Sequence, residues 1–315
     1  MSLISVNNIC HSYGKNKVLH GCSFAINKGE IVALLGESGS GKTTILRTLA
    51  GFERPDSGSI SMNNSLLYDQ QTMVLPEDRN IGLVFQDYAL FPHLNIRKNI
   101  ELGKSAGAKR TTSEWLNVVG LDGLDERRPD QLSGGQQQRV AIVRALAAEP
   151  ELILLDEPFS NIDESLKFGF RHELRKLLKE EGVSAVFVTH DTKDALAIAD
   201  QIVILKDGVI RQIGTPETIY QSPADLYVTG LLGPYNVVAK NGDECSIIRA
   251  EQCSIEANAQ QKGIVQSSMY QGNTFLIHIK ISDQIWIVEH PVALTLGEEV
   301  GIHFETNNLK TVQNK

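Results

Sequence analysis

The feature that most constrains this sequence is a glycine-rich octapeptide between an apolar run and an amphipathic stretch. It begins at Gly36, matches the pattern GxxxxGK[S/T] and directly follows the aliphatic run 31–35. Ile45, Leu46 and Leu49 then recur at helical spacing up to Gly51. A strand, a tight glycine turn and a helix start predict an α/β fold whose loop N–H groups point at a bound phosphate.

The side chains of this loop fit a nucleoside triphosphate with Mg²⁺. Lys42 is placed to reach the β- and γ-phosphates, and the Thr43 hydroxyl is placed to bind Mg²⁺. A chance glycine-rich turn is the alternative, and the flanking strand and helix argue against it. The expected ATP-contacting residues are Gly36, Glu37, Ser38, Gly39, Ser40, Gly41, Lys42, Thr43 and Thr44.

A second apolar run, residues 152–155, ends in the acids Asp156 and Glu157. Because α/β sheets build their sites at strand carboxyl ends, we expect Asp156 to hold Mg²⁺ or its waters beside the phosphate loop. Glu157 lies one residue further on and is the candidate general base for the attacking water. The alternative is a strand that ends in two solvent-exposed acidic residues with no catalytic role.

Composition restricts the partners of the chain. A formal net charge of -8 argues against a nucleic-acid partner, because phosphate-backbone affinity comes from clustered Lys and Arg. The longest apolar runs fall well short of the roughly 20 residues that a membrane-spanning helix needs, and residues 1–10 do not resemble a secretion signal. We therefore expect a cytosolic chain whose four cysteines are reduced and structural.

The pattern of predicted secondary structure changes after Gly233 and Pro234. Before them, short aliphatic strands alternate with helical stretches, which indicates a largely parallel sheet. After them no convincing helix occurs, and residues 275–281 and 285–288 show strand periodicity across a turn at 282–283. We expect domains at 1–234 and 235–315, the second being a small, OB-like β-barrel.

Many protein families share a phosphate loop and an acidic strand end, and one further segment distinguishes among them. Residues 132–136 read Leu-Ser-Gly-Gly-Gln and continue as a helix to Leu146. This segment closely resembles the signature sequence of ABC transporter ATPases, and the resemblance covers residues 3 to about 232. It implies a P-loop NTPase core with a parallel sheet, an antiparallel β subdomain and a helical subdomain at about 88–148.

The signature segment also bears on assembly. A hydroxyl and close-approaching N–H groups at a helix start make a second anion-binding surface, which one ATP cannot easily share with the phosphate loop of the same subunit. The resemblance implies that two copies dock head to tail as a homodimer with two composite ATP sites. The residues expected to contact the partner's ATP are Ser133, Gly134, Gly135, Gln136 and Asp163.

Three further positions match the family pattern. Tyr13 resembles the aromatic that stacks on adenine, Gln86 the glutamine that contacts Mg²⁺ and the attacking water, and His190 the histidine that contacts the γ-phosphate. Taken alone, these residues also fit an edge-strand aromatic, an exposed polar residue and a structural histidine. The expected catalytic set is Glu157, His190 and Gln86, and the expected Mg²⁺ set is Thr43, Gln86 and Asp156.

Residues 236–315 resemble the β-barrel extension of ATPases that serve binding-protein-dependent importers. Residues 247–251 look like its Val-Arg-Pro-Glu segment, with Ala250 in place of the proline. Together with residues 76–94, this tail is most similar to ferric-iron uptake ATPases, and polyamine, sulfate and phosphonate importers are the alternatives. The implied partners are two transmembrane permease subunits and, indirectly, a solute-binding protein, with the chain peripheral at the cytoplasmic face of the inner membrane.

Other roles stay open at this point. A soluble ABC ATPase that is not coupled to transport would typically carry two cassettes or a long coiled coil, which this sequence lacks. A non-catalytic regulator would tolerate loss of the base, whereas Glu157 is present. The barrel is either a ligand sensor or a dimer brace, and Cys245 and Cys253 would allow a redox response only in a reactive-thiol environment.

Overall fold

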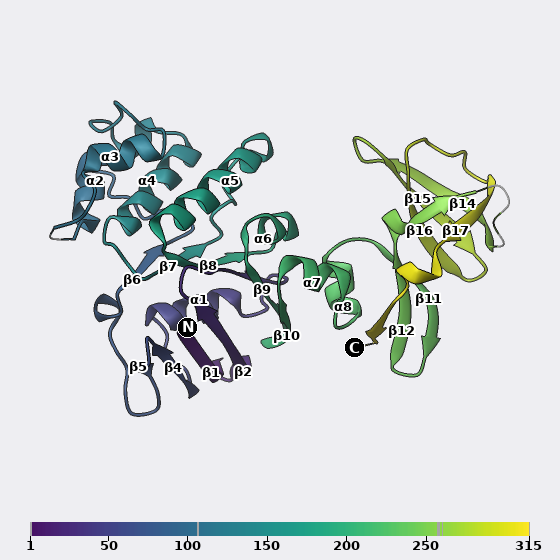
Figure 1. The fold of residues 1–315 in the computed structure, drawn as a ribbon, viewed down its shortest axis with the longest axis horizontal. Helices are drawn as coiled ribbons and strands as arrows, with labels where there is room; N and C mark the ends of the chain where they lie inside the picture. The colour runs from purple at the N-terminus through teal and green to yellow at the C-terminus, as the bar shows by residue number, and fades with distance from the viewer. Residues whose placement is uncertain (1, 106, 257–258, 260, 315) are drawn as a thin grey trace. The chain divides into compact units, whose positions relative to one another are not determined.

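The computed structural model of this chain describes residues 2–105, 107–256, 259 and 261–314, and it divides into two compact units, residues 1–216 and 217–315 (Figure 1). A six-stranded sheet in the order β10-β9-β3-β8-β7-β6 forms the centre of the first unit. All of its neighbouring pairs are parallel except β9 and β10. Its strands are β3 (Ile31–Leu35), β6 (Ile81–Val84), β7 (Leu152–Asp156), β8 (Ser184–Thr189), β9 (Gln201–Lys206) and β10 (Val209–Gly214).

The aliphatic runs of the sequence form the middle of this sheet. Every residue of β3 and β8 is buried, and so are the first four residues of β7. Strands covered on both faces have no polar side to show, which is why their sequences do not alternate. The carboxyl ends of β3, β7 and β8 lie at one edge, so the segments that follow them are brought together.

A second sheet in this unit is antiparallel, in the order β2-β1-β4-β5. Side chains of this sheet, of the central sheet and of α1 (Lys42–Ala50) share one apolar core. The phosphate-loop helix is therefore held by both sheets. The strands are β1 (Ser2–Tyr13), β2 (Asn16–Asn27), β4 (Ser57–Met62) and β5 (Ser65–Tyr68).

Helices form the remaining part of the first unit. In the upper left of Figure 1, α4 contacts both α2 and α3, and these three helices fall inside the range expected for a helical subdomain. Two further helices, α5 and α6, contact each other, and α6 also contacts β8. The bounds are α2 (Ile96–Gly103), α3 (Thr112–Val118), α4 (Gly134–Leu146), α5 (Glu164–Glu181) and α6 (Thr192–Ile198), with 3₁₀ helices at Pro76–Asp78 and Pro129–Gln131.

The second unit consists of two short helices followed by antiparallel strands in two sheets, β11-β12-β18 and β13-β17-β14-β15-β16. From Tyr235 onward, its described residues form strands and 3₁₀ turns with no α-helix, as expected. The elements are α7 (Pro216–Gln221), α8 (Leu226–Leu231), β11 (Tyr235–Asn241), β12 (Glu244–Arg249), β13 (Cys253–Ile255), β14 (Gln261–Tyr270), β15 (Phe275–Ile281), β16 (Gln284–His290), β17 (Glu299–Phe304), β18 (Lys310–Gln313), and 3₁₀ helices at Ala250–Gln252 and Thr306–Asn308.

Helices α7 and α8 pack with the strands that follow them. The buried Arg249 guanidinium lies 4.0 Å from the centre of the Tyr220 ring and donates a hydrogen bond to the Thr229 carbonyl. The chain therefore passes from the first compact unit to the second near residue 216, whereas the secondary structure changes at the expected boundary between residues 234 and 235. Which of the two marks the end of an independently folding part remains a prediction.

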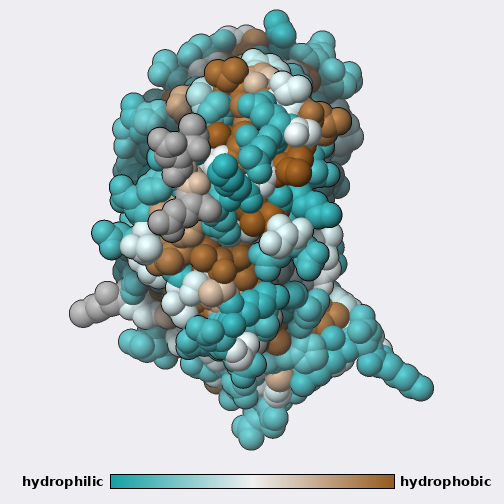
Figure 2. Space-filling model, turned by 90° about the vertical axis from the view of Figure 1, so that its right-hand side faces the viewer, coloured by the Kyte–Doolittle hydropathy of each residue, from teal (hydrophilic) through white to brown (hydrophobic). Residues whose placement is uncertain are grey.

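The surface of the second unit carries several apolar side chains. Figure 2, the view turned to face this unit, shows brown patches separated by hydrophilic side chains. The large apolar residues of this unit that are exposed are Ile264, Met269, Tyr270, Ile285, Val292 and Leu296. Scattered exposed apolar residues are normal on a protein surface.

Candidate active site

The glycine-rich loop lies between β3 and α1 as predicted. Gly36 packs so closely that a Cβ there would lie 2.2 Å from the Leu205 carbonyl oxygen, so no other residue fits. Gly41 has φ 101° and precedes the first turn of α1, a backbone conformation that favours glycine. The loop and the start of α1 border a cavity of about 280 Å³ beside the β1–β2 hairpin, lined by Asn16, Val18, Gly39, Gly41, Lys42, Thr43 and Thr44.

Lys42 is held against the loop that it follows. Its Nζ donates to the carbonyls of Gly36 at 2.8 Å and Glu37 at 2.7 Å. Burial lowers the pKa of Lys42, and the nearby carboxylates of Glu157 and Asp156 oppose that shift. An ammonium group and helix N–H groups that line one cavity provide the positive charge that a triphosphate needs.

Asp156 ends β7 beside the phosphate loop. Burial and the neighbouring Glu157 raise the pKa of Asp156, while Arg47, a hydrogen bond with the Thr43 side chain and Lys42 lower it. The hydroxyl of Thr43 and the carboxylate of Asp156 are thus in contact. Mg²⁺ prefers such oxygen ligands, and it takes only one or two from protein when phosphates and water supply the rest, so these residues fit the ion.

Glu157 has a backbone conformation that sequence reasoning did not predict. Its φ is 48°, which is rare outside glycine and costs on the order of 1–3 kcal/mol, so it persists only where the surroundings enforce it. Its N–H donates to the Val188 carbonyl at 3.2 Å, and its Oε1 lies 3.2 Å from the Nδ1 of His190. The turn therefore aims the carboxylate at the end of β8, where the expected base and the expected histidine meet.

Gln86 lies exposed in the turn that follows β6. Its carbonyl accepts a hydrogen bond from Asn161 Nδ2 at 3.3 Å, which links this turn to the segment after Glu157. Two residues further on, Tyr88 and Ala89 both have positive φ. Arg144 of α4 donates to both of their carbonyls, at 3.1 and 2.7 Å. Sequence reasoning missed this role of Arg144, because nothing in a helical arginine indicates a distant loop.

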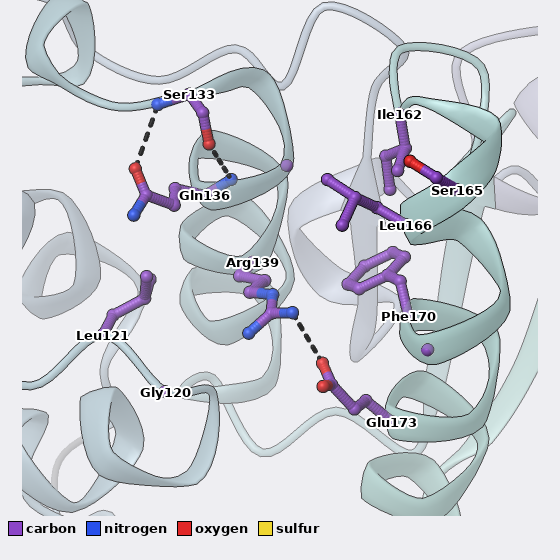
Figure 3. Close-up of a pocket in the computed structure, with 12 residues that line it drawn as sticks. Gly120, Leu121, Ser133, Gln136, Arg139, Ile162, Ser165, Leu166, Phe170 and Glu173 are labelled. Atoms are coloured by element: carbon purple, nitrogen blue, oxygen red, sulfur yellow. Dashed lines mark hydrogen bonds and ion pairs between the residues drawn. The ribbon is translucent and has the colours of Figure 1, made fainter.

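The signature segment forms the start of α4. The Ser133 hydroxyl accepts from the N–H of Gln136 at 3.4 Å, and the Gln136 side chain accepts from the N–H of Ser133 at 3.0 Å, a capping box (Figure 3). These residues line a cavity of about 360 Å³ between α4 and α5. The ion pair of Arg139 and Glu173, 2.7 Å apart, spans the same two helices.

The two remaining candidates lie at element ends. Tyr13 ends β1 with 44% of its surface exposed, and its hydroxyl donates to Glu53 Oε1 at 3.0 Å. It is paired in register with Asn16, which lines the phosphate-loop cavity. Asp163 is exposed before the first residue of α5, and its side chain makes no capping hydrogen bond. Adenine stacking by Tyr13 and a partner contact by Asp163 stay predictions.

Comparison with known proteins decides the family. The profile of the ABC transporter family matches residues 19–160, and that of the TOBE domain matches residues 247–309. A Fe(3+) ions import ATP-binding protein of Haemophilus influenzae is 36% identical over 98% of this chain and 96% of its own length. The chain belongs to the ABC transporter family. Its activity is accordingly that of an ABC ATPase, as expected from the phosphate loop and signature.

Other relatives are also named as import ATP-binding proteins. One for sulfate/thiosulfate, from Thermosynechococcus vestitus, is 40% identical over 95% of this chain and 90% of the relative. One for spermidine/putrescine, from Acetivibrio thermocellus, is 36% identical over 96% of this chain and 94% of the relative. The expected likeness to ATPases of importers is confirmed, and this chain is an ABC importer ATPase subunit.

Solved structures confirm the fold of the first unit. A dimeric ATP-binding cassette in a post-hydrolysis state with ADP and phosphate aligns with a TM-score of 0.59 and 34% identity, over 68% of this chain and 99% of its own. A subunit of an ABC transporter complex from Clostridium perfringens aligns with a TM-score of 0.62 and 26% identity, over 70% of this chain and 90% of its own. In the part of this chain that the structure describes, no helix is both long and apolar enough to cross a bilayer.

Proposed function

We propose that this importer ATPase works as a homodimer beneath two transmembrane permease subunits, at the cytoplasmic face of the inner membrane, and energises uptake of Fe³⁺. The observation that carries the catalytic part is the meeting of Lys42, Asp156, Glu157 and His190 around the phosphate loop. The post-hydrolysis dimer of a similar cassette supports the homodimer.

The residues divide the work of hydrolysis among them. Lys42 and the loop N–H groups hold the β- and γ-phosphates, and Tyr13 orients the adenine. Glu157 takes the proton of the attacking water, while His190 holds the carboxylate and contacts the γ-phosphate. Thr43, Asp156 and Gln86 would hold Mg²⁺, which would supply positive charge against the charge that develops on the phosphates.

The signature segment completes the site from the partner subunit. Ser133 begins a helix whose first N–H groups carry partial positive charge, which suits the γ-phosphate of an ATP bound elsewhere. Gly134 and Gly135 leave that helix start without side chains, so an anion can approach the backbone closely. Closing the dimer on ATP and opening it after hydrolysis would pass motion to the permease through the turn at Gln86.

The identity of the transported solute is the most specific part of this proposal. Relatives named for Fe³⁺, sulfate/thiosulfate and spermidine/putrescine are all similar to this chain over most of its length. The solute-binding protein and permease, and not this subunit, would contact the solute. The alternative cargoes are therefore sulfate, a polyamine or a phosphonate, with the same ATPase mechanism.

The test connects the ATPase to one solute. The chain is reconstituted with its co-purifying permease subunits, and ATPase stimulation is measured with binding protein loaded with Fe³⁺, sulfate, polyamine or phosphonate. Stimulation by the Fe³⁺-loaded form alone supports ferric import. Stimulation by another loaded form keeps the mechanism and replaces the cargo, and a basal rate insensitive to every loaded form contradicts coupling to import.

A further inference from the structure

A buried polar network surrounds the backbone on both sides of His190. Arg171 of α5 donates from Nε to Asp194 Oδ1 at 2.6 Å, and its Nη2 forms an ion pair with the same oxygen at 2.5 Å. Both side chains are almost fully enclosed, with 10% and 4% of their surfaces exposed. Two charges buried this deeply hold their geometry, because breaking the pair would leave an uncompensated charge.

This pair continues directly to the two neighbours of the histidine. The Thr189 hydroxyl donates to Asp194 Oδ2 at 3.1 Å and accepts from the N–H of Asp191 at 3.0 Å. Arg171 Nη2 also lies 3.4 Å from Asp191 Oδ2. The residue before His190 and the residue after it are thus tied to one ion pair.

The side chain of His190 is 60% exposed, in contrast to the buried network beside it, and its Nδ1 lies 3.2 Å from Glu157 Oε1. An exposed imidazole on a mobile backbone would sample many positions relative to that carboxylate. Fixing the backbone at 189 and 191 restricts where the ring can go.

We propose that Arg171, Asp194 and Thr189 form a positioning network that sets the place of His190 against Glu157 for ATP hydrolysis. The inference rests on the proposed roles of Glu157 and His190. Burial raises the pKa of the Asp194 carboxyl and the nearby Asp191 adds to the rise, while Arg171 and Thr189 oppose it.

The chain offers a conservative probe and a matched control. Thr189→Val keeps the shape of the buried side chain and removes its hydroxyl, whereas Thr189→Ser restores the hydroxyl. The control is Asp200→Asn. Arg175 lies one turn along α5 from Arg171, and its Nη2 donates to Oδ1 of Asp200 at 2.9 Å, just after the end of α6. Asp200 also accepts from the N–H of Ile31 and from Lys179 of α5, so this control weakens the packing around α5 without touching the neighbours of His190.

The first measurement is steady-state ATPase activity of the full-length chain. Because a displacement of about 1 Å at a reacting centre costs on the order of 10²-fold, we expect Thr189→Val to lower kcat about 10- to 100-fold, with KM for ATP within about twofold. Thr189→Ser recovers most of the rate, and Asp200→Asn keeps it. Equal losses in Thr189→Val and Asp200→Asn, or a rise in KM alone, would overturn the proposal.

A second comparison asks whether the network acts through His190. In a His190→Ala background, Thr189→Val should cost no further activity, because the group that it positions is gone. An additional loss in the double variant, as large as in the parent, contradicts positioning through this histidine.

The third measurement does not depend on turnover. The histidine side chains are labelled with ¹⁵N, and the His190 signal, assigned by its loss in His190→Ala, is compared between the parent and Thr189→Val. A shifted or broadened signal supports the network, and an unchanged one overturns it. A parent chain without ATPase activity would instead contradict the proposed catalytic roles, and the His190 signal would still decide the positioning.

Discussion

At the scale of single residues, the site depends on a backbone conformation at Glu157 that is energetically unfavourable for residues other than glycine. Glu157 has a positive φ, and its backbone N–H bonds the neighbouring strand β8, so the turn after β7 is fixed by the sheet. Strained backbone of this kind persists where function requires a side chain in one direction. Here that direction is toward His190 and the phosphate loop.

Replacing Glu157 by Gln should abolish turnover and leave ATP binding intact. The amide keeps the size of the side chain and loses the ability to take a proton, so we expect a fall in kcat of about 10²-fold or more. The variant should accumulate as an ATP-bound dimer, seen by size-exclusion chromatography with ATP and by phosphate release. The surface variant Glu164→Gln serves as a control. A Glu157→Gln chain that is fully active, or monomeric with ATP, would contradict the assignment.

Cysteine burial leads to a second prediction at this scale. Burial raises the pKa of Cys253 to about 11, and burial also raises that of Cys22 to about 11. At pH 8 the thiolate fraction of each is about one in a thousand, so both should resist alkylation while the chain is folded. In a Cys10→Ser background, iodoacetamide labelling followed by mass spectrometry should detect both only in urea. Rapid labelling of Cys253 in the folded chain would favour a redox role for the second unit.

At the scale of elements, the start and the end of α4 have different tasks. Its start is the capping box of Ser133 and Gln136, and near its end Arg144 holds the loop after Gln86. One helix thus joins the surface that is proposed to contact the partner's ATP and the turn that is proposed to face the permease. The sequence identified the start of this helix, because the capping residues coincide with the signature.

Arg144→Ala should destabilise the first unit. The guanidinium donates to the carbonyls of Tyr88 and Ala89, and it also lies 5.7 Å from the ring centre of Phe91. Leaving the partly buried Tyr88 carbonyl without its donor costs about 1–3 kcal/mol, so the urea midpoint should fall accordingly. Arg97→Ala, which breaks an ion pair with Asp125 in the same subdomain, is the comparison and should cost less than about 1 kcal/mol. Equal costs would contradict the proposed anchoring.

At the scale of the whole molecule, the chain joins an ATPase unit to a β unit through α7 and α8. Ile219, Val228 and Thr229 are fully buried, and these helices cluster with the strands that follow them. A cut at residue 235 therefore removes the strands with which both helices cluster. Residues 1–216 form a compact unit of their own, so we expect the ATPase unit to fold without them.

Deleting residues 236–315 should leave a folded ATPase core with unchanged nucleotide affinity. In this fragment, limited proteolysis should remove residues 217–235 quickly, because the partners of α7 and α8 are gone, while the same bonds resist cleavage in the full chain. A fragment comprising residues 1–216 provides the matched comparison. Failure of both fragments to fold would contradict the independence of the first unit, and protection of residues 217–235 would contradict their packing on the strands.

The sequence by itself determined the phosphate loop, the acidic strand end, the signature helix start and the change to strands after residue 234, since each depends on neighbouring residues. Only the tertiary structure decided that Glu157 bends toward His190, that Arg144 holds the loop at Tyr88, and that Arg171 reaches both neighbours of His190. It also grouped α7 and α8 with the second unit. Local patterns report backbone periodicity and turn chemistry, whereas contacts between residues distant in the chain depend on how the elements pack.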